Sequence, residues 1–594
     1  MSGRPPSPAT GEAAVRLEAM VENGTRAEGE RLVILGVTNT PDSGAALIVD
    51  GRIVAAANEE RFVRKKLVQC FPSESIGWAL ASAGLRIGDV DWVGSGCWKG
   101  IDQADTLPIL VRDIVSQAGH EDGLQQAERR VQVSASRDEA FRQELYGSLR
   151  ELGVPDNRVL CCDHHYSHAV TAFYPSPFDE ALVFTADGRG DFRSVTLWEA
   201  SRTDGLRLLD CASEITSPGA LYGLITKYLG FVPDRHEGKV TGLAAHGTRG
   251  PAYDLLRSVF FYDQAGGRLR SRIGPCFRPF ASAEPPGLAG ALEGVSREDV
   301  AYGVQKVLEE VLCAFLLRHI GARPRKSVNL CLAGGCMSNV KLNYELADLP
   351  QVRGVYVFPQ MGDGGNALGG AMSVAIQRDG IRRFDMPTVY LGPEYGDADV
   401  EAAFRSEGVG HRRLGADAPA VVADLIAAGR IVGWYQGRLE YGPRALGSRS
   451  ILAQATDASI NTTLNARLHR TEFMPFAPVT IDAYAASCFE GWEPDQVSSR
   501  FMTICYRATK LLAQRCPAVV HVDGTARPQV VFREHNPAYY DVVKAYIEKT
   551  GNPALINTSF NHHEEPIVNT PRDAVRSLRK GNVDVLVAGQ LITI

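Results

Sequence analysis

The amino-acid sequence predicts an α/β protein of two or more domains, with a duplicated unit in its first part. Its 594 residues exceed what one ordinary hydrophobic core holds. Apolar residues make up 45% of the chain and charged residues 22%, which is typical of a globular protein. Two separate stretches repeat the order strand, polar turn, strand and helix. We therefore expect a functional site in the cleft between two similar halves.

The composition argues against two classes of main partner and indicates the redox state of the cysteines. A formal net charge of −6 and a pI near 6.2 argue against nucleic acid or an anionic membrane as the main partner. The twelve cysteines include no CxxC pair, which favours reduced thiols in a cytoplasmic protein. No apolar run reaches the roughly 18 residues that span a bilayer. Residues 1–30 lack the apolar core of a signal peptide, and we expect a partly disordered leader.

The first unit begins at Arg31. RLVILGVTNT, AALIVDG and RIVAAANEE read as three strands, and the pair Asp50-Gly51 predicts a tight hairpin turn between the last two. ESIGWALASAGL then has the apolar spacing of a helix.

The second unit begins at DEALVFTADGRGD, and the strand SVTLWEA follows its acidic turn. The glycine loop LCLAGGCMSN lies between a strand and a helix, which is the setting for phosphate binding at a helix N-terminus. The chain turns polar and proline-bearing around residues 378–397. We place the domain boundary there, with domains at 31–385 and 386–594.

Three histidines stand at the start of the predicted helix HHYSHAVTAFY. His164 and His168 are four residues apart and share one helix face, whereas His165 points about 100° away. Two imidazoles on one turn are a common way to hold a metal. The pattern alone is weak, since a polar start to a buried helix explains it equally well.

Two acidic loops shift the balance toward a metal. Asp187 ends the strand ALVFTA, and Asp363 follows the strand GVYVFP in the loop MGDGGNALGGA. Each aspartate alone is explained by an Asp-Gly turn. Together with His164 and His168 they would form an N₂O₂ site with open positions, which suits Fe(II) or Mn(II) better than structural zinc and leaves room for phosphate oxygens.

A series of motifs resembles a known family. The chain resembles the O-carbamoyltransferases of antibiotic and nodulation-factor biosynthesis from Arg31 to Val587. The resemblance implies an N-terminal domain of the actin-like ATPase superfold (a duplicated RNase H-like fold), similar to the tRNA threonylcarbamoyl-transferring protein. It also implies an α+β C-terminal domain similar to the threonylcarbamoyl-adenylate synthases. The motifs are, in order, RLVILGVTNTPDSGAALIVDG, EERFVRKK, HHYSHA, GKVTGLAAHG, GGCMSN, GRLEYGPRALGSRS, PFAPV, RPQ and NTSFN with EPIV.

The resemblance implies a reaction in two steps. Carbamoyl phosphate and ATP, with Mg(II), give carbamoyl adenylate in the C-terminal domain. A hydroxyl group of a secondary metabolite then attacks the adenylate carbonyl in the N-terminal domain, beside the Fe(II) or Mn(II) ion. The family's metal ligands fall on His164, His168, Asp187 and Asp363.

The resemblance also assigns residues to the substrates. Asp42 and Lys239 are the candidate catalytic residues, although a surface lysine would explain Lys239 almost as well. A surface ion pair is the alternative for each arginine, but clustering in family-like motifs favours phosphate contacts. The expected nucleotide contacts are Gly334, Gly335, Asn339, Arg444 and Arg449. The expected carbamoyl-phosphate contacts are His469, Arg470, Arg527, Asn557 and Ser559.

The chain departs from the family's pattern at three places. Pro41 replaces a histidine that is the family's expected base, which leaves Asp42 for that role. A phosphate-binding lysine falls in a gap between Leu468 and His469, and an arginine becomes Met474, so His469 is the candidate replacement cation. Glu564 stands where glycine usually precedes Glu-Pro.

These departures keep other functions open. One alternative is a repurposed enzyme that forms another acyl or amide product through an adenylate, and another is a metal-retaining pseudoenzyme. An acidic chain without a basic stripe disfavours action on tRNA. The acceptor and the oligomeric state are left open, with a homodimer as one option.

Overall fold

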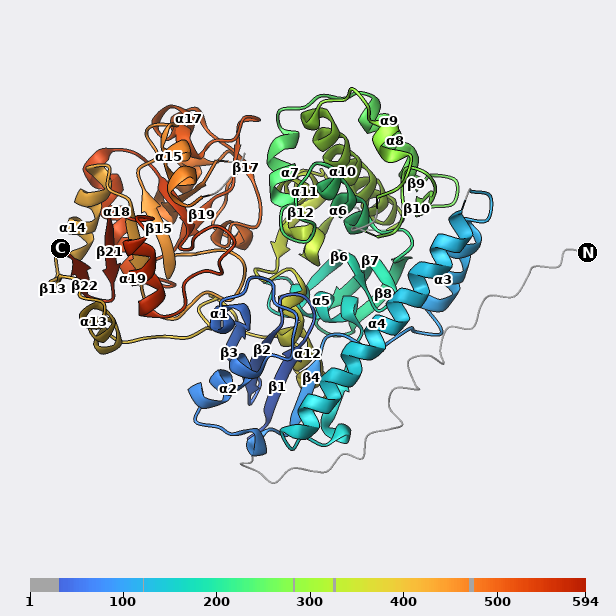
Figure 1. The fold of residues 1–594 in the computed structure, drawn as a ribbon, viewed down its shortest axis with the longest axis horizontal. Coiled ribbons are helices and arrows are strands. Elements are labelled where there is room, and N and C mark those ends of the chain that lie inside the picture. Colours follow the sequence, from blue (N-terminus) through green and yellow to red (C-terminus); the bar gives the residue numbers. More distant parts are fainter. Residues whose placement is uncertain (1–30, 121, 281–283, 324–326, 470–474) are drawn as a thin grey trace, which may run out of the picture.

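The computed structural model describes residues 31–120, 122–280, 284–323, 327–469 and 475–594. The expected leader (1–30), Arg470 and Met474 lie outside these ranges. Figure 1 shows the C-terminal part of the chain, orange to red, beside a larger N-terminal part that runs from blue to olive.

The first sheet of the N-terminal part has the strand order β3-β2-β1-β4-β5. β1 pairs antiparallel with β2 and parallel with β4. Asp50 and Gly51, at φ 48° and 74°, form the turn between β2 and β3, so the predicted hairpin is confirmed. The strands are β1 (Val33–Thr38), β2 (Gly44–Val49), β3 (Arg52–Asn58), β4 (Trp92–Ser95) and β5 (Val159–Cys161). The helices around it are α1 (Glu60–Val63), α2 (Ser73–Ser82) and α4 (Gly123–Glu151), whereas α3 (Thr106–Val115) packs on the second sheet.

The second sheet repeats this topology. Its order is β12-β11-β6-β7-β8, with β6 antiparallel to β7 and parallel to β11. The first strand of each unit is thus central, with a hairpin on one side and two parallel strands on the other. This is the duplicated RNase H-like arrangement, and the predicted α/β fold class is confirmed. The strands are β6 (Glu180–Gly190), β7 (Arg193–Ser201), β8 (Gly205–Ser213), β11 (Val328–Ala333) and β12 (Val352–Val357).

Further elements surround the second sheet. They include the hairpin of β9 (Phe260–Asp263) and β10 (Arg268–Ser271). The helices are α6 (Pro218–Tyr228), α7 (Glu237–Ala244), α8 (Pro251–Val259), α9 (Leu288–Ala291), α10 (Arg297–Gly321) and α11 (Val340–Ala347).

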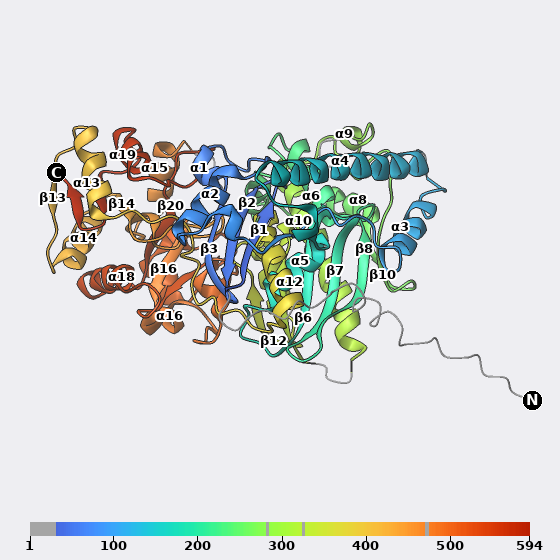
Figure 2. The ribbon, with the colours of Figure 1, turned by 90° about the horizontal axis from the view of Figure 1, so that it is seen from below.

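Two helices are exchanged between the halves of the N-terminal part. α5 (His164–Phe173) follows β5 of the first sheet but packs on β6 and β11 of the second. α12 (Asn366–Asp379) follows β12 of the second sheet but packs on β1 and β4 of the first. The two helices also pack on each other, between the sheets (Figure 2). Their N-termini therefore bring residues from both halves into one place.

Helix α12 packs so closely on the first sheet that two positions on the strands have no room for a side chain. A Cβ atom added to Gly36 on β1 would lie 2.0 Å from the carbonyl oxygen of Ala367. One added to Gly94 on β4 would lie 2.3 Å from the carbonyl oxygen of Gly370. Glycine is therefore required on both strands so that backbone can pack on backbone.

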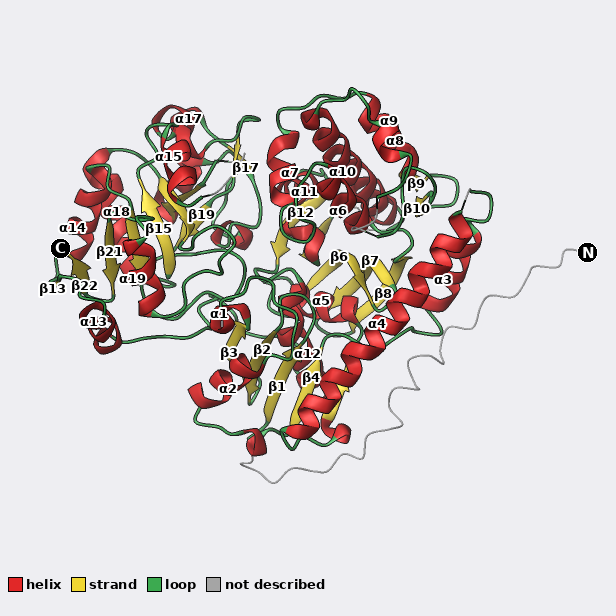
Figure 3. Ribbon diagram, in the orientation of Figure 1, coloured by secondary structure: helices red, strands yellow, loops and turns green. Residues whose placement is uncertain are grey.

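The C-terminal part is a mixed sheet covered by helices, and Figure 3 shows helices and strands in both parts. The main sheet has the order β13-β22-β21-β14-β15-β20-β16-β19, and β17 pairs with β18. The strands are β13 (His411–Arg413), β14 (Val432–Tyr435), β15 (Arg449–Ala453), β16 (Ala477–Ile481), β17 (Tyr506–Arg507), β18 (Thr525–Ala526), β19 (Gln529–Val531), β20 (Leu555–Ser559), β21 (Val585–Ala588) and β22 (Leu591–Thr593). The helices are α13 (Asp397–Ser406), α14 (Ala418–Ala427), α15 (Ile460–Arg467), α16 (Asp482–Cys488), α17 (Lys510–Arg515), α18 (Pro537–Thr550) and α19 (Pro571–Arg579). The predicted domain boundary at residues 385–386 falls between α12 and α13 and stays a prediction.

The two parts share an apolar core and a set of hydrogen bonds to main-chain oxygens. Leu446 and Phe501 of the C-terminal part belong to the same buried cluster as Ile34. The Arg61 guanidinium donates to the carbonyl oxygen of Gly442 at 2.9 Å. Similar bonds run from Arg64 to the carbonyl oxygens of Pro566 and Ile567, and from Arg438 to that of Val54.

The described ranges contain neither a helix that could span a membrane nor a disulfide bond. None of the helices there is both long and apolar enough to cross a bilayer. All twelve cysteines fall within these ranges, and none of them is in a disulfide.

The close approach of α12 gives a test by matched glycine substitutions. Gly36→Ala should lower the free energy of unfolding by about 1–3 kcal/mol, because the new methyl group overlaps a main-chain oxygen. Gly77→Ala is the control, since Gly77 lies inside helix α2 with nothing within 4 Å of an added Cβ. Gly77→Ala should raise stability by roughly 0.5–1 kcal/mol. Equal denaturant midpoints for the two variants would contradict this packing.

Candidate functional site

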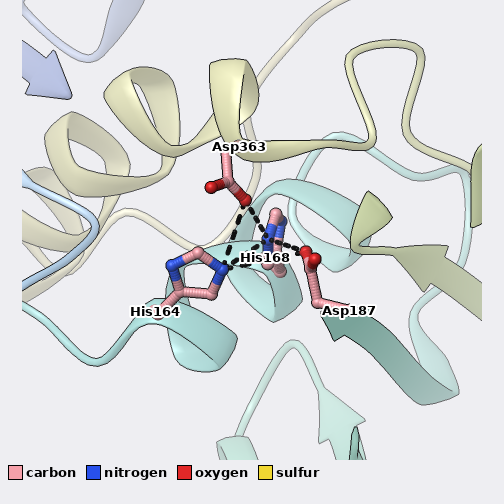
Figure 4. A group of neighbouring side chains, drawn as sticks. All are labelled: His164, His168, Asp187 and Asp363. Atoms are coloured by element: carbon pink, nitrogen blue, oxygen red, sulfur yellow. Dashed lines mark hydrogen bonds and ion pairs between the residues drawn. The ribbon is translucent and has the colours of Figure 1, made fainter. Parts of the chain in front are cut away.

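Four side chains with metal-ligand atoms meet at the N-termini of the exchanged helices (Figure 4). His164 and His168 lie on the first turns of α5, Asp187 near the end of β6, and Asp363 just before α12. One ligand atom from each residue lies within 4.8 Å of the others. The two histidine Nε2 atoms are 3.1 Å apart. The nearest carboxylate oxygens are Asp187 Oδ2, 3.2 Å from His168 Nε2, and Asp363 Oδ1, 3.4 Å from His164 Nε2.

Local structure positions three of these four side chains, His164, His168 and Asp187. The Asp163 carboxylate caps α5 by accepting from the backbone N–H of Tyr166 at 2.8 Å, which sets the first residue of the helix. The ladder between β6 and β7 is interrupted between Ala186 and Gly190. This irregularity releases Asp187 from the regular alternation of the strand, so that its carboxylate reaches the histidines.

The carboxylates of Asp187 and Asp363 favour a positive charge beside them. Burial disfavours the protonated form of His164, but the neighbouring Asp363 and Asp187 carboxylates outweigh it and hold the pKa of His164 well above its usual value. Burial opposes the charge of Asp187 as well, yet hydrogen bonds from His164 and His168 hold the pKa of that carboxyl well below its usual value. Two carboxylates in this buried space thus favour a positive charge beside them, and the donor set of two imidazoles and two carboxylates fits a divalent metal ion.

His165 has a different role from its two neighbours. Its Nδ1 atom lies 2.7 Å from the hydroxyl oxygen of Thr185, and the side chain is fully buried. Burial, together with the neighbouring His164 and His168, holds the pKa of His165 well below its usual value, so the ring is neutral. His165 packs inside the fold while the other two face the carboxylates.

Further contacts hold the two aspartates from outside the group. The backbone N–H of Gly335 donates to Asp187 Oδ2 at 2.9 Å, and that of Gly188 donates to Asp187 Oδ1 at 2.6 Å. On the other side, the Tyr441 hydroxyl donates to the carbonyl oxygen of Gly364, the residue after Asp363, at 2.5 Å. Tyr441 belongs to the C-terminal part, so one ligand loop of the N-terminal part is held by the other part of the chain.

The predicted base Asp42 lies next to the group. Its Oδ2 accepts from the side-chain amide of Gln360 at 2.8 Å. An added Cβ on Gly364 would lie 2.4 Å from this oxygen, so the carboxylate packs against the backbone beside Asp363. Burial and the charge of Glu60 raise the pKa of Asp42 to about 8. A carboxyl group with that pKa exchanges its proton near neutral pH, which is what general-base catalysis requires.

Two of the predicted nucleotide residues of the N-terminal part lie against the end of β6, beside Asp187. Gly334 and Gly335 pass directly over the end of β6. The Asn339 side chain caps α11 and pairs with the side chain of Gln305. Lys239 is only 5% exposed, so the surface-lysine alternative is wrong. The contacts of these residues with nucleotide stay predictions.

The arginine-rich loop of the C-terminal part is organised by a buried glutamate. Glu440 Oε1 accepts from the backbone N–H groups of Leu446, Ser448 and Arg449. The Arg449 side chain is fully buried and donates to the carbonyl oxygens of Gln436 and Gly437 at 2.8 and 3.1 Å. A phosphate contact through Arg449 would require these bonds to break. Arg444 is half-buried in the same loop.

The other predicted residues of this part come together only in part. β15 pairs with β20, where Asn557 donates to the side chain of Gln529 at 2.6 Å and Ser559 donates to Asn561 at 2.6 Å. Arg527 is half-buried and lies just before β19. His469 is exposed, with its ring centroid 4.6 Å from that of His562. Arg470 lies outside the described residues.

Comparison with protein families matches both parts of the chain. Residues 33–372 match the family model described as carbamoyltransferase N-terminus, and residues 423–594 match carbamoyltransferase C-terminus.

The chain belongs to the carbamoyltransferase family. It is 34% identical to nodulation protein NolNO of Sinorhizobium fredii, over 93% of this chain and 78% of that protein. It is 36% identical to nodulation protein NolO of Bradyrhizobium diazoefficiens, over 72% of this chain and 78% of that protein. The solved structure of T. kodakarensis HypF shares 15% identity over 59% of this chain and 48% of that one, with a TM-score of 0.30 that is too low to carry an argument.

Sequence reasoning missed several residues of this carbamoyltransferase. Tyr441 and Glu440 stand inside the quoted motif GRLEYGPRALGSRS, but only its arginines were singled out. Asn366 lies with its side-chain nitrogen 3.4 Å from His164 Nδ1, and Gln360 orients Asp42. In the sequence, Asn366 and Gln360 could have been singled out only as polar residues that flank the glycine loop of Asp363.

The contact of Tyr441 with the Asp363 loop can be tested by removing one hydroxyl group. Tyr441→Phe should weaken binding of Fe(II) or Mn(II) by roughly 10–100-fold, as the loss of supporting contacts around metal ligands typically does. Tyr435→Phe is the control, because the buried Tyr435 hydroxyl also donates to a carbonyl oxygen, that of Asn569 at 2.7 Å, within the C-terminal part. Both variants should lose roughly 1–3 kcal/mol of stability. Unchanged metal affinity in Tyr441→Phe would show that the contact does not support the group.

Proposed function

We propose that this carbamoyltransferase moves a carbamoyl group from carbamoyl phosphate, through carbamoyl adenylate, to a hydroxyl group of a small-molecule acceptor. The proposal rests on one observation: His164, His168, Asp187 and Asp363 come together beside Asp42. The relatives that are nodulation proteins, and the resemblance to O-carbamoyltransferases of antibiotic biosynthesis, support a secondary metabolite as acceptor.

The four-residue group would hold the metal ion of the transfer step. Imidazole and carboxylate ligands with open positions suit Fe(II) or Mn(II). When bound, such an ion neutralises charge on the phosphate of the leaving group. Gly334 and Gly335, which lie over Asp187, would place nucleotide close to the same group.

Asp42 would accept the proton of the acceptor hydroxyl. The hydroxyl oxygen forms a bond to the carbamoyl carbon, the bond from that carbon to the phosphate oxygen breaks, and AMP leaves. The hydrogen bond from Gln360 holds the Asp42 carboxylate in place while its proton is exchanged. Pro41 cannot serve, because its side chain has no titratable group.

The C-terminal part would form the adenylate from carbamoyl phosphate and ATP, with Mg(II). Arg444 and Arg527 are the half-buried arginines proposed to contact phosphate, together with His469, Asn557 and Ser559. Arg449 would act indirectly, because its bonds to carbonyl oxygens and its place 3.7 Å from the Tyr435 ring centroid hold the loop that carries Arg444.

The two steps can be separated by reciprocal variants. Arg527→Ala should abolish formation of carbamoyl adenylate from ATP and carbamoyl phosphate, detected by mass spectrometry, but spare transfer from supplied carbamoyl adenylate. His164→Ala/His168→Ala should do the reverse. Arg533→Ala is the control, since the Arg533 side chain is 64% exposed and pairs with Asp541. Equal loss of both steps in Arg527→Ala would contradict two separate sites, and no adenylate from the unmutated protein would favour a repurposed enzyme or a pseudoenzyme.

The proposed base gives a pH-dependent test. With a pKa near 8, Asp42 is mostly protonated at neutral pH, so transfer should rise with pH and level off above about 8. Asp42→Asn should lower transfer roughly 100-fold or more and remove this rise. Asparagine also tolerates the backbone φ of 68° at this position, so the loop should keep its shape. Transfer at the unmutated rate in Asp42→Asn would exclude Asp42 as the base.

A further inference from the structure

A second group of metal-ligand side chains lies where the two parts of the chain meet. His236 comes just before α7 in the N-terminal part, and His563 and Glu564 lie in the loop after β20 in the C-terminal part. One ligand atom from each lies within 4.8 Å of the others. All three residues are partly buried.

The distances within this group fit a small metal ion. His236 Nε2 lies 3.0 Å from Glu564 Oε1, and His563 Nε2 lies 3.5 Å from the same oxygen. Around a tetrahedral zinc ion, ligand atoms at about 2.0–2.1 Å from the metal are roughly 3.4 Å from one another. The two imidazoles therefore approach one carboxylate oxygen at the spacing that shared coordination requires.

The conformation of Glu564 is a second and independent observation. Its φ is 62°, a left-handed value that is uncommon for a glutamate. Its other oxygen, Oε2, accepts from Arg235 at 3.2 Å, which leaves Oε1 turned toward both histidines. Strained backbone persists where the surroundings hold it, and it is often found at binding sites.

We propose that His236, His563 and Glu564 bind a zinc(II) ion that links the two parts of the chain. Two imidazoles and one carboxylate are ligands that zinc accepts, whereas magnesium and calcium prefer oxygen alone. Three protein ligands leave a fourth position for water. The group shares no residue with His164, His168, Asp187 and Asp363, and its occupancy does not depend on the reaction proposed above.

The test is a zinc titration of the full chain carrying His164→Ala/His168→Ala, which removes the first group. One equivalent of zinc should bind, measured by competition with a chromophoric chelator. Loss of a residue that only supports a ligand weakens metal binding about 10–100-fold. Loss of a ligand itself should weaken zinc binding by about 100-fold or more, and the three ligand variants are His236→Ala, His563→Ala and Glu564→Gly. Glycine suits the left-handed φ at position 564, so Glu564→Gly should fold normally.

Neighbouring residues provide matched controls. His562→Ala and Glu565→Gln change the same loop outside the group, where Glu565 pairs with Lys580 at 2.7 Å, and both should bind zinc as the parent does. Cobalt(II) in place of zinc should give the intense visible absorption of tetrahedral coordination in the parent and lose it in Glu564→Gly. The proposal is overturned if the parent binds no zinc, if the three ligand variants bind like the parent, or if His562→Ala loses as much affinity as His563→Ala. Such results would assign the group to ion pairs of Glu564 with His236, His563 and Arg235 instead of a metal ion.

Discussion

Two carboxylates and two imidazoles share one buried space, and they meet there only because both halves of the N-terminal part contribute to it. Asp187 and Asp363 come from the second half of that part, whereas His164 and His168 begin the helix that follows the first. Neither half alone holds a complete set of ligands. The exchange of α5 and α12 between the sheets brings the four side chains together. The close packing of α12 on the first sheet depends on Gly36 and Gly94.

Support for this group extends across the domain contact. Tyr441 holds the loop of Asp363 from the C-terminal part, and Asp42 packs against the same loop from the first sheet. The candidate metal ligands and the proposed base are therefore placed by three separate regions of the chain. A change in how the two parts dock would alter the contact of Tyr441 with the Asp363 loop.

The sequence predicted the local features well, because strand alternation, the Asp50-Gly51 turn and the glycine loops are encoded by neighbouring residues. It also singled out the four residues that the structure brings together. It could not show that Arg449 is buried against carbonyl oxygens, because exposed and buried arginines look the same in a sequence. Nor could it show that the Gly335 amide binds Asp187, since a main-chain donor has no residue type of its own.

Four side chains help to dock the two parts by donating hydrogen bonds to main-chain oxygens, in contrast to the side-chain pairs of Glu564 with Arg235 and His236. Arg61, Arg64, Arg438 and Tyr441 are the donors, and their acceptors are carbonyl groups on the opposite part. A carbonyl oxygen survives any substitution of its own residue, provided the backbone path is kept. At these four contacts only the donor residue must be kept, whereas the pairs of Glu564 with Arg235 and His236 depend on both side chains. A substitution at an acceptor residue of these four contacts should therefore disturb the docking less than a substitution at its donor.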